Sequence, residues 1–173
     1  EEKSTTAEVF NTLDETASKS EQWVIKNQKI ILISLAAIVV FILGYLAYLK
    51  YVDGPKEKDA ANELAFPKAY FEDAISNTVA ADSLFTLALN GADGKFGFVD
   101  IAKEYSGTKA ANLANYYAGI SYLKLKNYKE AIEYLEDFSS DDELLGPIAK
   151  GAIGDAFADI NQPEDALDYY LEA

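Results

Sequence analysis

The most regular feature of the chain is an uninterrupted apolar stretch near its beginning. Residues 30–49 read IILISLAAIVVFILGYLAYL, twenty positions without a charged side chain. At about 1.5 Å of rise per residue, such a helix matches a bilayer hydrocarbon core of roughly 30 Å. A buried core helix is the alternative, but such helices are usually shorter and keep a polar face. The pattern therefore predicts a single transmembrane helix over residues 30–50.

Aromatic and basic residues lie at both edges of this predicted transmembrane helix. Amphipathic rings and lysines favour the headgroup layer of a membrane, where one end of the side chain is apolar and the other is hydrated. The candidate membrane anchors are Trp23, Lys26, Lys29, Tyr45, Tyr48, Lys50 and Tyr51. The two flanks carry similar numbers of lysines, so the positive-inside rule leaves the orientation open.

Residues 1–29 form a short juxtamembrane segment with a thin helical stripe of apolar side chains. Thr12 followed by Glu15 fits a capping box, so a helix is expected to begin near residue 13 and run into the apolar stretch. The stripe is too thin to fold alone. Two interpretations stay open, a partly ordered tail in solvent and a helix that docks on a partner subunit.

Turn-forming residues follow the apolar stretch. The sequence Asp53-Gly54-Pro55 predicts a break in the helix, and residues 51–56 are interpreted as a linker. Apolar residues then recur at helical spacing to about residue 77, with Pro67 expected to kink or split the helix. Residues 90–94, NGADG, predict a turn, and residues 96–105 predict another helix that ends at the glycine of residue 107.

The last third of the chain contains an internal repeat. Thr108 is placed to cap a helix running to about residue 126, and a second helix reaches residue 138 before the plan begins again. Three positions recur 35 residues later, in the pairs Gly119 and Gly154, Tyr122 and Phe157, and Ala131 and Ala166. A fixed period of this size is typical of stacked helical hairpins. Residues 57–173 are therefore expected to form an all-α domain, with repeats at 112–146 and 147–173, the second incomplete.

These residues resemble the tetratricopeptide repeat (TPR). In that family small residues let the two helices of a hairpin cross closely, and aromatic residues fill the gap between hairpins. The matching positions are Gly119, Tyr122, Ala131 and Leu135 in the first repeat and Gly154, Phe157, Ala166 and Tyr170 in the second. Asn115 stands where the family often has tryptophan, and the period is one residue longer than the family pattern. The resemblance implies a solenoid of antiparallel helical hairpins.

The resemblance also implies a concave surface lined by the first helix of each hairpin. The candidate groove residues are Leu113, Tyr116, Ile120, Leu123, Lys124, Ile148, Asp155 and Asp159. The first four are apolar or aromatic, so we expect the groove to bind an extended or partly unfolded polypeptide. The family's basic clamp for a peptide carboxylate is not matched, because Tyr116 and Ile120 occupy its Lys and Asn positions. Alternatively, some of these side chains are buried against a neighbouring helix.

Composition argues against several classes of function. Acidic residues outnumber basic ones by 29 to 15, a net charge of −14, so no nucleic-acid partner is expected. The chain has no His and no Cys, which removes the usual general base and the commonest metal ligands. We expect no enzyme activity, no cofactor and no small-molecule substrate. An enzyme that uses carboxylates alone is the least favoured alternative.

Two acidic or glycine-rich segments suggest ligand sites only superficially. Five acids, Glu136, Asp137, Asp141, Asp142 and Glu143, could in principle bind calcium, but Ser140 with Glu143 fits a capping box and explains them better. The turn NGADGK lacks the spacing of a phosphate-binding loop, since Phe96 follows its lysine. The absence of Met and the apolar residues near Ala173 lead us to expect further sequence at both ends.

The order of a short N-terminal segment, one transmembrane helix and an acidic TPR-like domain resembles the YfgM-type family of bacterial inner-membrane proteins. The resemblance implies a cytoplasmic N-terminus and a periplasmic repeat domain. It also implies partners, namely membrane lipid, the SecYEG translocon, periplasmic chaperones such as the PpiD-type isomerase, and unfolded clients. The implied role is an ancillary subunit that contacts emerging secreted or membrane polypeptides. A scaffold or adaptor of another cell-envelope assembly or secretion machine is the alternative.

Overall fold

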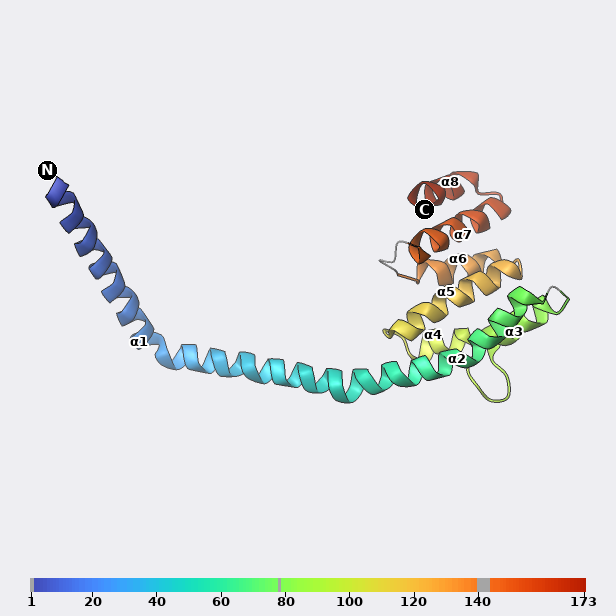
Figure 1. Cartoon of the computed structure of the whole chain (residues 1–173), viewed down its shortest axis with the longest axis horizontal. Helices are drawn as coiled ribbons and strands as arrows, with labels where there is room; N and C mark the ends of the chain where they lie inside the picture. The colour runs from blue at the N-terminus through green and yellow to red at the C-terminus, as the bar shows by residue number, and fades with distance from the viewer. Residues whose placement is uncertain (1, 78, 140–143) are drawn as a thin grey trace. The chain divides into compact units, whose positions relative to one another are not determined.

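The computed structural model describes residues 2–77, 79–139 and 144–173, with side chains described from residue 23 onward. Within these ranges the chain is all-helical (Figure 1), and an isolated bridge between Ala92 and Lys95 is the only strand-like pairing. The all-α fold class is thereby confirmed. The chain divides into two compact units, Glu1–Lys50 and Tyr51–Ala173.

The first unit is a single helix, α1 (Glu2–Tyr48). It begins at Glu2, so Thr12 lies inside the helix and the expected capping box near residue 13 is wrong. Within this unit every side chain from Ile30 to Tyr48 is exposed. An 18-residue window here has a mean hydropathy of 2.9, and no other helix in the described ranges is both long and apolar enough to cross a membrane.

Helical geometry continues through residues 51–56, which were expected to form a linker. A π-helical turn, η1 (Leu49–Asp53), follows α1, and α2 (Gly54–Ser76) begins directly after it. Asp53 keeps right-handed helical angles, with φ −71° and ψ −45°. Pro55 lies in the first turn of α2, where its missing N–H needs no partner. The proline therefore does not interrupt the helix. The expected break is therefore only a change of helix type.

In the second unit, α2 packs against α3 (Ala81–Asn90) and α4 (Phe98–Glu104). α2 runs through Pro67 without splitting, contrary to one of the two outcomes expected for this proline. Pro67 is buried, and Leu64 and Phe71 on either side of it are buried too. Packing on both sides therefore holds the helix across the hydrogen bond that proline removes.

The turn expected at residues 90–94 is confirmed between α3 and α4. Gly91, Asp93 and Gly94 all have positive φ angles, between 53° and 75°. A side chain is also excluded at Gly91, because its Cβ would lie 2.1 Å from the carbonyl oxygen of Lys95. The loop closes so tightly that only glycine fits at this position.

Two helical hairpins complete the second unit. The first consists of α5 (Lys109–Lys124) and α6 (Tyr128–Glu136), and the second of α7 (Leu145–Asp159) and α8 (Pro163–Glu172). α6 has 9 residues and α8 has 10. The capping box expected at Ser140 and Glu143, together with the acids beside it, lies outside the described residues.

Two hydrophobic clusters form the core of the second unit. The first joins α2, α3, α4 and α5 around Phe71, whose ring centroid lies 5.7 Å from Phe85, 6.1 Å from Phe98 and 5.0 Å from Tyr117. The second joins α6 and α7 and is built from Ile132, Leu135, Ala149, Ala152, Ile153 and Ala156. Ile120 on α5 packs against both clusters, so the hairpins continue one core rather than forming a separate one.

The first turn of α2 caps the start of α5. The backbone N–H groups of Lys109 and Ala110 donate to the two carboxylate oxygens of Glu57, at 2.9 and 3.3 Å. Thr108 acts as the N-cap that was expected, since its Oγ1 accepts from the N–H of Ala111 at 3.0 Å. Three N–H groups at the start of α5 are therefore satisfied by side chains, and a negative charge lies at the positive end of the helix dipole.

The substitution Glu57→Gln tests this cap. Gln keeps one acceptor but loses the charge, so we expect the free energy of unfolding of the full chain in detergent to fall by about 1 kcal/mol. The matched control is Glu130→Gln, which removes an acid from the first turn of α6. Chemical denaturation followed by circular dichroism measures both. Equal losses in the two variants would show that the contact with α5 contributes nothing of its own.

Candidate functional site

The internal repeat is present in three dimensions at the glycines. Gly119 faces Leu135 across the first hairpin, and an added Cβ would lie 2.4 Å from the Leu135 Cγ. Gly154 faces Tyr170 across the second hairpin, and its Cβ would lie 2.6 Å from the ring. Leu135 and Tyr170 are themselves separated by the 35-residue period. Both hairpins therefore cross at the same register, and they can do so only because glycine has no side chain.

Aromatic stacking repeats with the same period. Tyr122 stacks on Tyr134 with ring centroids 5.4 Å apart, and Phe157 stacks on Tyr169 at 5.5 Å. We expected Tyr122 and Phe157 to fill the gap between hairpins, but each stacks on a tyrosine of its own hairpin. Sequence reasoning did not single out Tyr134 and Tyr169, although their separation of 35 residues is a readable signal.

The turn inside each hairpin is also repeated. Lys126 and Asn161 both have φ 62°, the left-handed conformation. In the first hairpin the N–H of Asn127 donates to the carbonyl of Tyr122 at 2.9 Å, and the bond from Gln162 to Phe157 in the second has the same length. These are Schellman turns, which satisfy the last carbonyls of a helix. The left-handed conformation of Lys126 could not be predicted from the sequence, because lysine rarely adopts it.

The structure brings only some residues of the candidate groove together. Leu113 packs against the first core cluster, while Tyr116, Ile120 and Leu123 pack against the second. The ring of Tyr116 lies 5.2 Å from that of Phe138. These apolar side chains are therefore half-buried against neighbouring helices, and the groove stays a prediction. Ile148 remains 44% exposed.

Four residues of the candidate groove do meet, in a surface pocket of about 370 Å³ between the two hairpins. They are Leu123 and Lys124 from α5 and Asp155 and Asp159 from α7. The Tyr170 hydroxyl donates to Asp155 at 2.8 Å, and this bond raises the pKa of Tyr170. Desolvation and the nearby Asp159 carboxylate raise the pKa of Tyr128. The pocket is therefore polar, and the Tyr170 hydroxyl already engages one of its two carboxylates.

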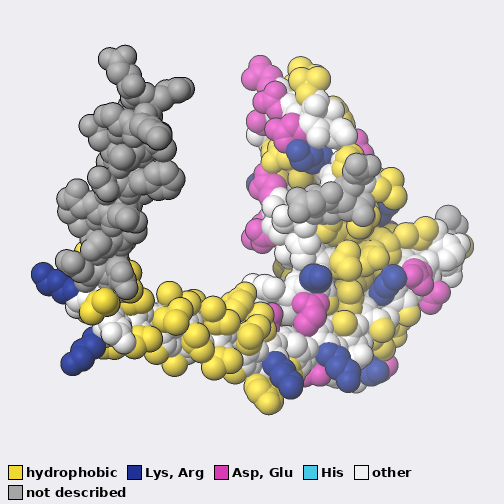
Figure 2. Space-filling model, turned by 60° about the vertical axis from the view of Figure 1, so that its left-hand side comes forward, with side chains coloured by type: hydrophobic (Ala, Val, Ile, Leu, Met, Phe, Trp, Pro, Cys, Tyr) yellow, Lys and Arg dark blue, Asp and Glu magenta, His cyan; other side chains and the backbone are white. Residues whose placement is uncertain are grey.

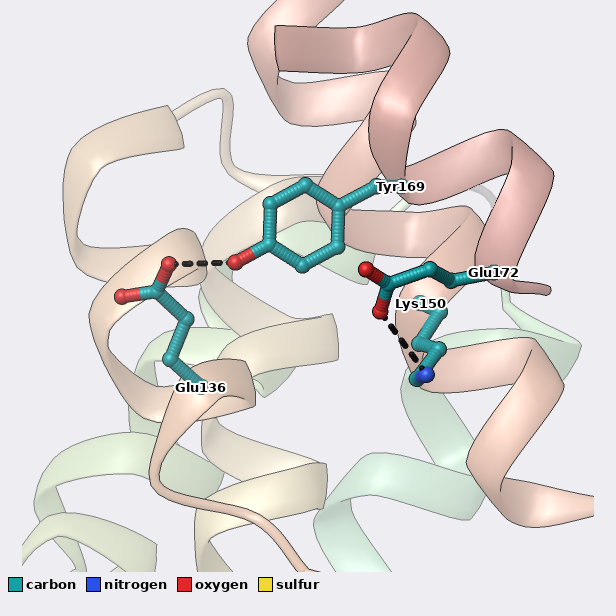
Figure 3. A network of polar contacts seen from close by, with 4 residues as sticks. All are labelled: Glu136, Lys150, Tyr169 and Glu172. Atoms are coloured by element: carbon teal, nitrogen blue, oxygen red, sulfur yellow. Dashed lines mark hydrogen bonds and ion pairs between the residues drawn. The ribbon is translucent and has the colours of Figure 1, made fainter.

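Polar contacts tie α8 to the two helices before it (Figure 3). The Tyr169 hydroxyl donates to Glu136 Oε1 on α6 at 2.7 Å, and Lys150 Nζ on α7 donates to Glu172 at 2.9 Å. The hydrogen bond to Glu136, together with burial, raises the pKa of Tyr169 to about 12. Tyr169 thus joins the second hairpin to the first.

The candidate membrane anchors are all exposed to solvent in the described chain. Trp23, Lys26 and Lys29 precede the apolar stretch of α1, and Tyr45, Tyr48, Lys50 and Tyr51 lie at its far end. An exposed ring in water gains nothing from its apolar face, whereas at a membrane surface that face is solvated by lipid. The distribution of these side chains suits a helix whose two ends lie at interfaces.

Metal-ligating side chains are not clustered among the described residues. No group of three or more His, Cys, Asp or Glu side chains in these ranges is arranged to hold a metal ion. The chain matches no family model, no curated protein and no solved structure. Function is therefore inferred from the internal repeat and from the apolar helix.

Substitution of glycines distinguishes the effect of the close helix crossing on stability from the effect of helix propensity. We expect Gly119→Ala to destabilise the chain by about 1–3 kcal/mol, because the new methyl group overlaps Leu135. Gly151→Ala on α7 is the matched control, since nothing lies within 4 Å of its Cβ position. That change should stabilise by up to about 1 kcal/mol through helix propensity. Thermal unfolding followed by circular dichroism measures both, and stabilisation by Gly119→Ala would contradict the crossing.

The Tyr169 contact predicts a pH dependence. The pKa of Tyr169 is raised from 10.0 to about 12 in the folded chain, so the folded state holds this proton more tightly than the unfolded state does. The resulting stabilisation is fully present below pH 10 and is lost as the pH rises to about 12. Absorbance of tyrosinate should show a group titrating near pH 12 that Tyr169→Phe removes and Glu136→Gln shifts toward pH 10. Unchanged absorbance amplitude near pH 12 in the Tyr169→Phe variant would refute the assignment.

Proposed function

We propose that this chain is a single-pass membrane protein whose second unit is a TPR-like repeat domain that binds polypeptides. The observation that carries the proposal is the repetition of contacts every 35 residues. Glycine crossings, stacked rings and Schellman turns each recur with this period. Recurrence of three kinds of contact with one period supports a repeat architecture, whose usual role is recognition of other proteins.

The apolar helix supports the membrane part of the proposal. Side chains from Ile30 to Tyr48 are exposed all around the helix. Soluble proteins rarely leave so large a continuous apolar surface in water. A bilayer is a favourable environment for this apolar surface, because the backbone is hydrogen-bonded within the helix and the side chains face lipid. Membrane anchoring also raises the local concentration of the repeat domain near membrane partners.

The resemblance to YfgM-type proteins extends the proposal to a particular machine. In this reading the chain lies in the bacterial inner membrane with its N-terminus in the cytoplasm and its repeat domain in the periplasm. There it assists the SecYEG translocon and contacts emerging polypeptides or periplasmic chaperones. The polar pocket at Lys124 and Asp159 supports binding of polypeptide through charged and hydrogen-bonding groups rather than through an apolar groove.

Native purification tests the translocon role. The full chain, tagged and expressed at its normal level, would be purified from membranes of its source organism in mild detergent and analysed by mass spectrometry. We expect SecY and SecE to co-purify, together with a periplasmic chaperone. A tagged single-span protein of unrelated sequence is the control for nonspecific membrane association. Absence of SecY and SecE, under conditions that retain other weak complexes, would refute this role, and enrichment of another envelope assembly would favour the adaptor.

A further inference from the structure

A surface pocket of about 730 Å³ lies over α5, between α4 and α6 (Figure 1). This volume is within the range of pockets that bind ligands. α4 and the end of α6 supply its two walls, and the buried Ala111 of α5 lies at its base. We call it the α4–α6 pocket. All of its lining residues lie between Val99 and Asp137, so α7 and α8 take no part in it.

The internal repeat relates the α4–α6 pocket to a second pocket, of about 510 Å³, between α6 and the α7–α8 hairpin. Four residues that line the α4–α6 pocket have counterparts 35 residues later that line the second pocket. The pairs are Lys103 and Phe138, Ala111 and Gly146, Asn115 and Lys150, and Tyr134 and Tyr169. The two pockets therefore occupy equivalent places in the repeat.

Polar groups of the second pocket are paired within the chain (Figure 3). Lys150 Nζ donates to Glu172 at 2.9 Å. The Tyr169 hydroxyl donates to Glu136 at 2.7 Å. An ammonium group thus lies against a carboxylate of the second helix of the hairpin, and the tyrosine bonds a carboxylate of the preceding hairpin.

In the α4–α6 pocket the first of these pairs lacks its basic member. Asp137 stands at the position of Glu172, but Asn115 stands at the position of Lys150. The Asn115 amide donates to the backbone carbonyl of Asp137, at 3.4 Å, and no ion pair among the described residues engages the Asp137 carboxylate. The chain therefore supplies a cation to this position in one repeat and not in the other.

The second pair lacks its acidic member. Tyr134 corresponds to Tyr169, but the buried Ile101 stands at the position of Glu136. Burial raises the pKa of Tyr134, and nearby carboxylates such as that of Glu133 raise it further. One wall of the pocket thus presents a tyrosine hydroxyl among carboxylates, with no partner for that hydroxyl on α4.

The opposite side of the α4–α6 pocket is basic. Lys103 on α4 and Lys109 at the start of α5 line it, and neither side chain forms an ion pair with another described residue. Exposed charges alone do not mark a site, since Figure 2 shows both basic and acidic side chains among apolar ones on the visible face of the second unit. The α4–α6 pocket differs because an equivalent pocket in the same chain holds an ammonium group against the corresponding acid.

We propose that the α4–α6 pocket binds an extended polypeptide segment through a basic side chain, Lys or Arg, that pairs with Asp137. This side chain lies where Lys150 lies in the equivalent pocket. An acidic side chain of the same segment pairs with Lys103 or Lys109 on the other side. The inference rests on the polypeptide binding proposed above and names a site separate from the pocket at the end of α5.

Other ligands suit these walls less well. An anion alone would be repelled by Glu133 and Asp137, and a cation alone by Lys103 and Lys109. A free α-amino acid such as glycine carries both charges at one carbon atom, whereas α4 and α6 each pack on α5, and packed helix axes are about 8–10 Å apart. Alternate side chains of an extended polypeptide are about 7 Å apart on one side, and long side chains span the remaining distance.

A short charged peptide is the probe for this site. It is a fluorescently labelled heptapeptide of serine and alanine with one lysine and one glutamate two residues apart. Binding to the full chain in detergent would be followed by fluorescence anisotropy at low ionic strength, where charge pairs are screened least. In control peptides norleucine replaces the lysine or glutamine replaces the glutamate. We expect the norleucine peptide to bind about five to ten times more weakly.

Variants of the full chain locate the binding. Asn115→Lys supplies the cation from within the chain, as Lys150 does, so we expect it to weaken peptide binding about tenfold. Asn115→Gln is the matched control, since it lengthens the side chain without adding charge and should leave the affinity within about twofold. Asp137→Asn removes the acid without filling the pocket and should weaken binding about five to ten times. Lys124→Gln, in the other pocket, should leave binding unchanged.

The lysine side of the pocket has its own test. Lys103→Gln with Lys109→Gln should weaken binding of the peptide that contains glutamate and leave binding of the glutamine peptide unchanged. This difference separates a direct pair with the glutamate from a general loss of fold, which circular dichroism of each variant also monitors.

Three results would overturn the proposal. The first is absence of peptide binding by the unaltered chain. The second is equal affinity of the unaltered chain and the folded Asp137→Asn variant. The third is displacement of the peptide by an equal concentration of free lysine, since this would make a small amino acid the occupant. Peptide binding that neither Asp137→Asn nor Asn115→Lys affects would leave polypeptide binding standing and refute only this site. Co-purification of SecY is measured separately, so failure of the translocon role is distinguishable from both.

Discussion

The second unit depends on how closely its paired helices can approach. At Gly119 and Gly154 the facing side chain occupies the space that a Cβ would fill. This contact fixes the register of each hairpin, and the register in turn aligns the stacked rings and positions the turn. A helix pair held apart by larger side chains would lose all three together. Absence of a side chain at two positions is therefore the constraint that makes the two hairpins alike.

The two units differ in whether their apolar side chains are exposed or buried. α1 exposes apolar side chains without a polar face over the length of a bilayer, whereas the second unit buries its apolar residues in two linked clusters. The chain as a whole carries a net charge of −14, which repels a nucleic acid electrostatically.

Sequence anticipated the features that depend on local or periodic signals. The apolar stretch, the turn at residues 90–94, the N-cap at Thr108 and the two hairpins all follow from spacing and side-chain chemistry. The helical path through residues 51–56 did not, because Pro55 can begin a helix as readily as it can end one. The choice between a groove and burial could not be made from the sequence for a different reason. A repeat pattern shows which face of α5 side chains lie on, but only packing shows that Tyr116 and Ile120 are half-buried against the core clusters. The contact of Glu57 with α5 has no local signal, since its partners lie 52 and 53 residues away.

That distant contact has a consequence for the order in which the second unit forms. The α5–α6 and α7–α8 hairpins close through neighbouring residues, so each can assemble as soon as its own segment is available. The cap between Glu57 and α5 closes a loop of 52 residues that includes α3 and α4, and it must await the synthesis of Lys109. Until then, α2 is a helix whose apolar face lacks α5 as a partner. On a growing chain this interval exposes Phe71 and its neighbours, and it ends when the first repeat emerges.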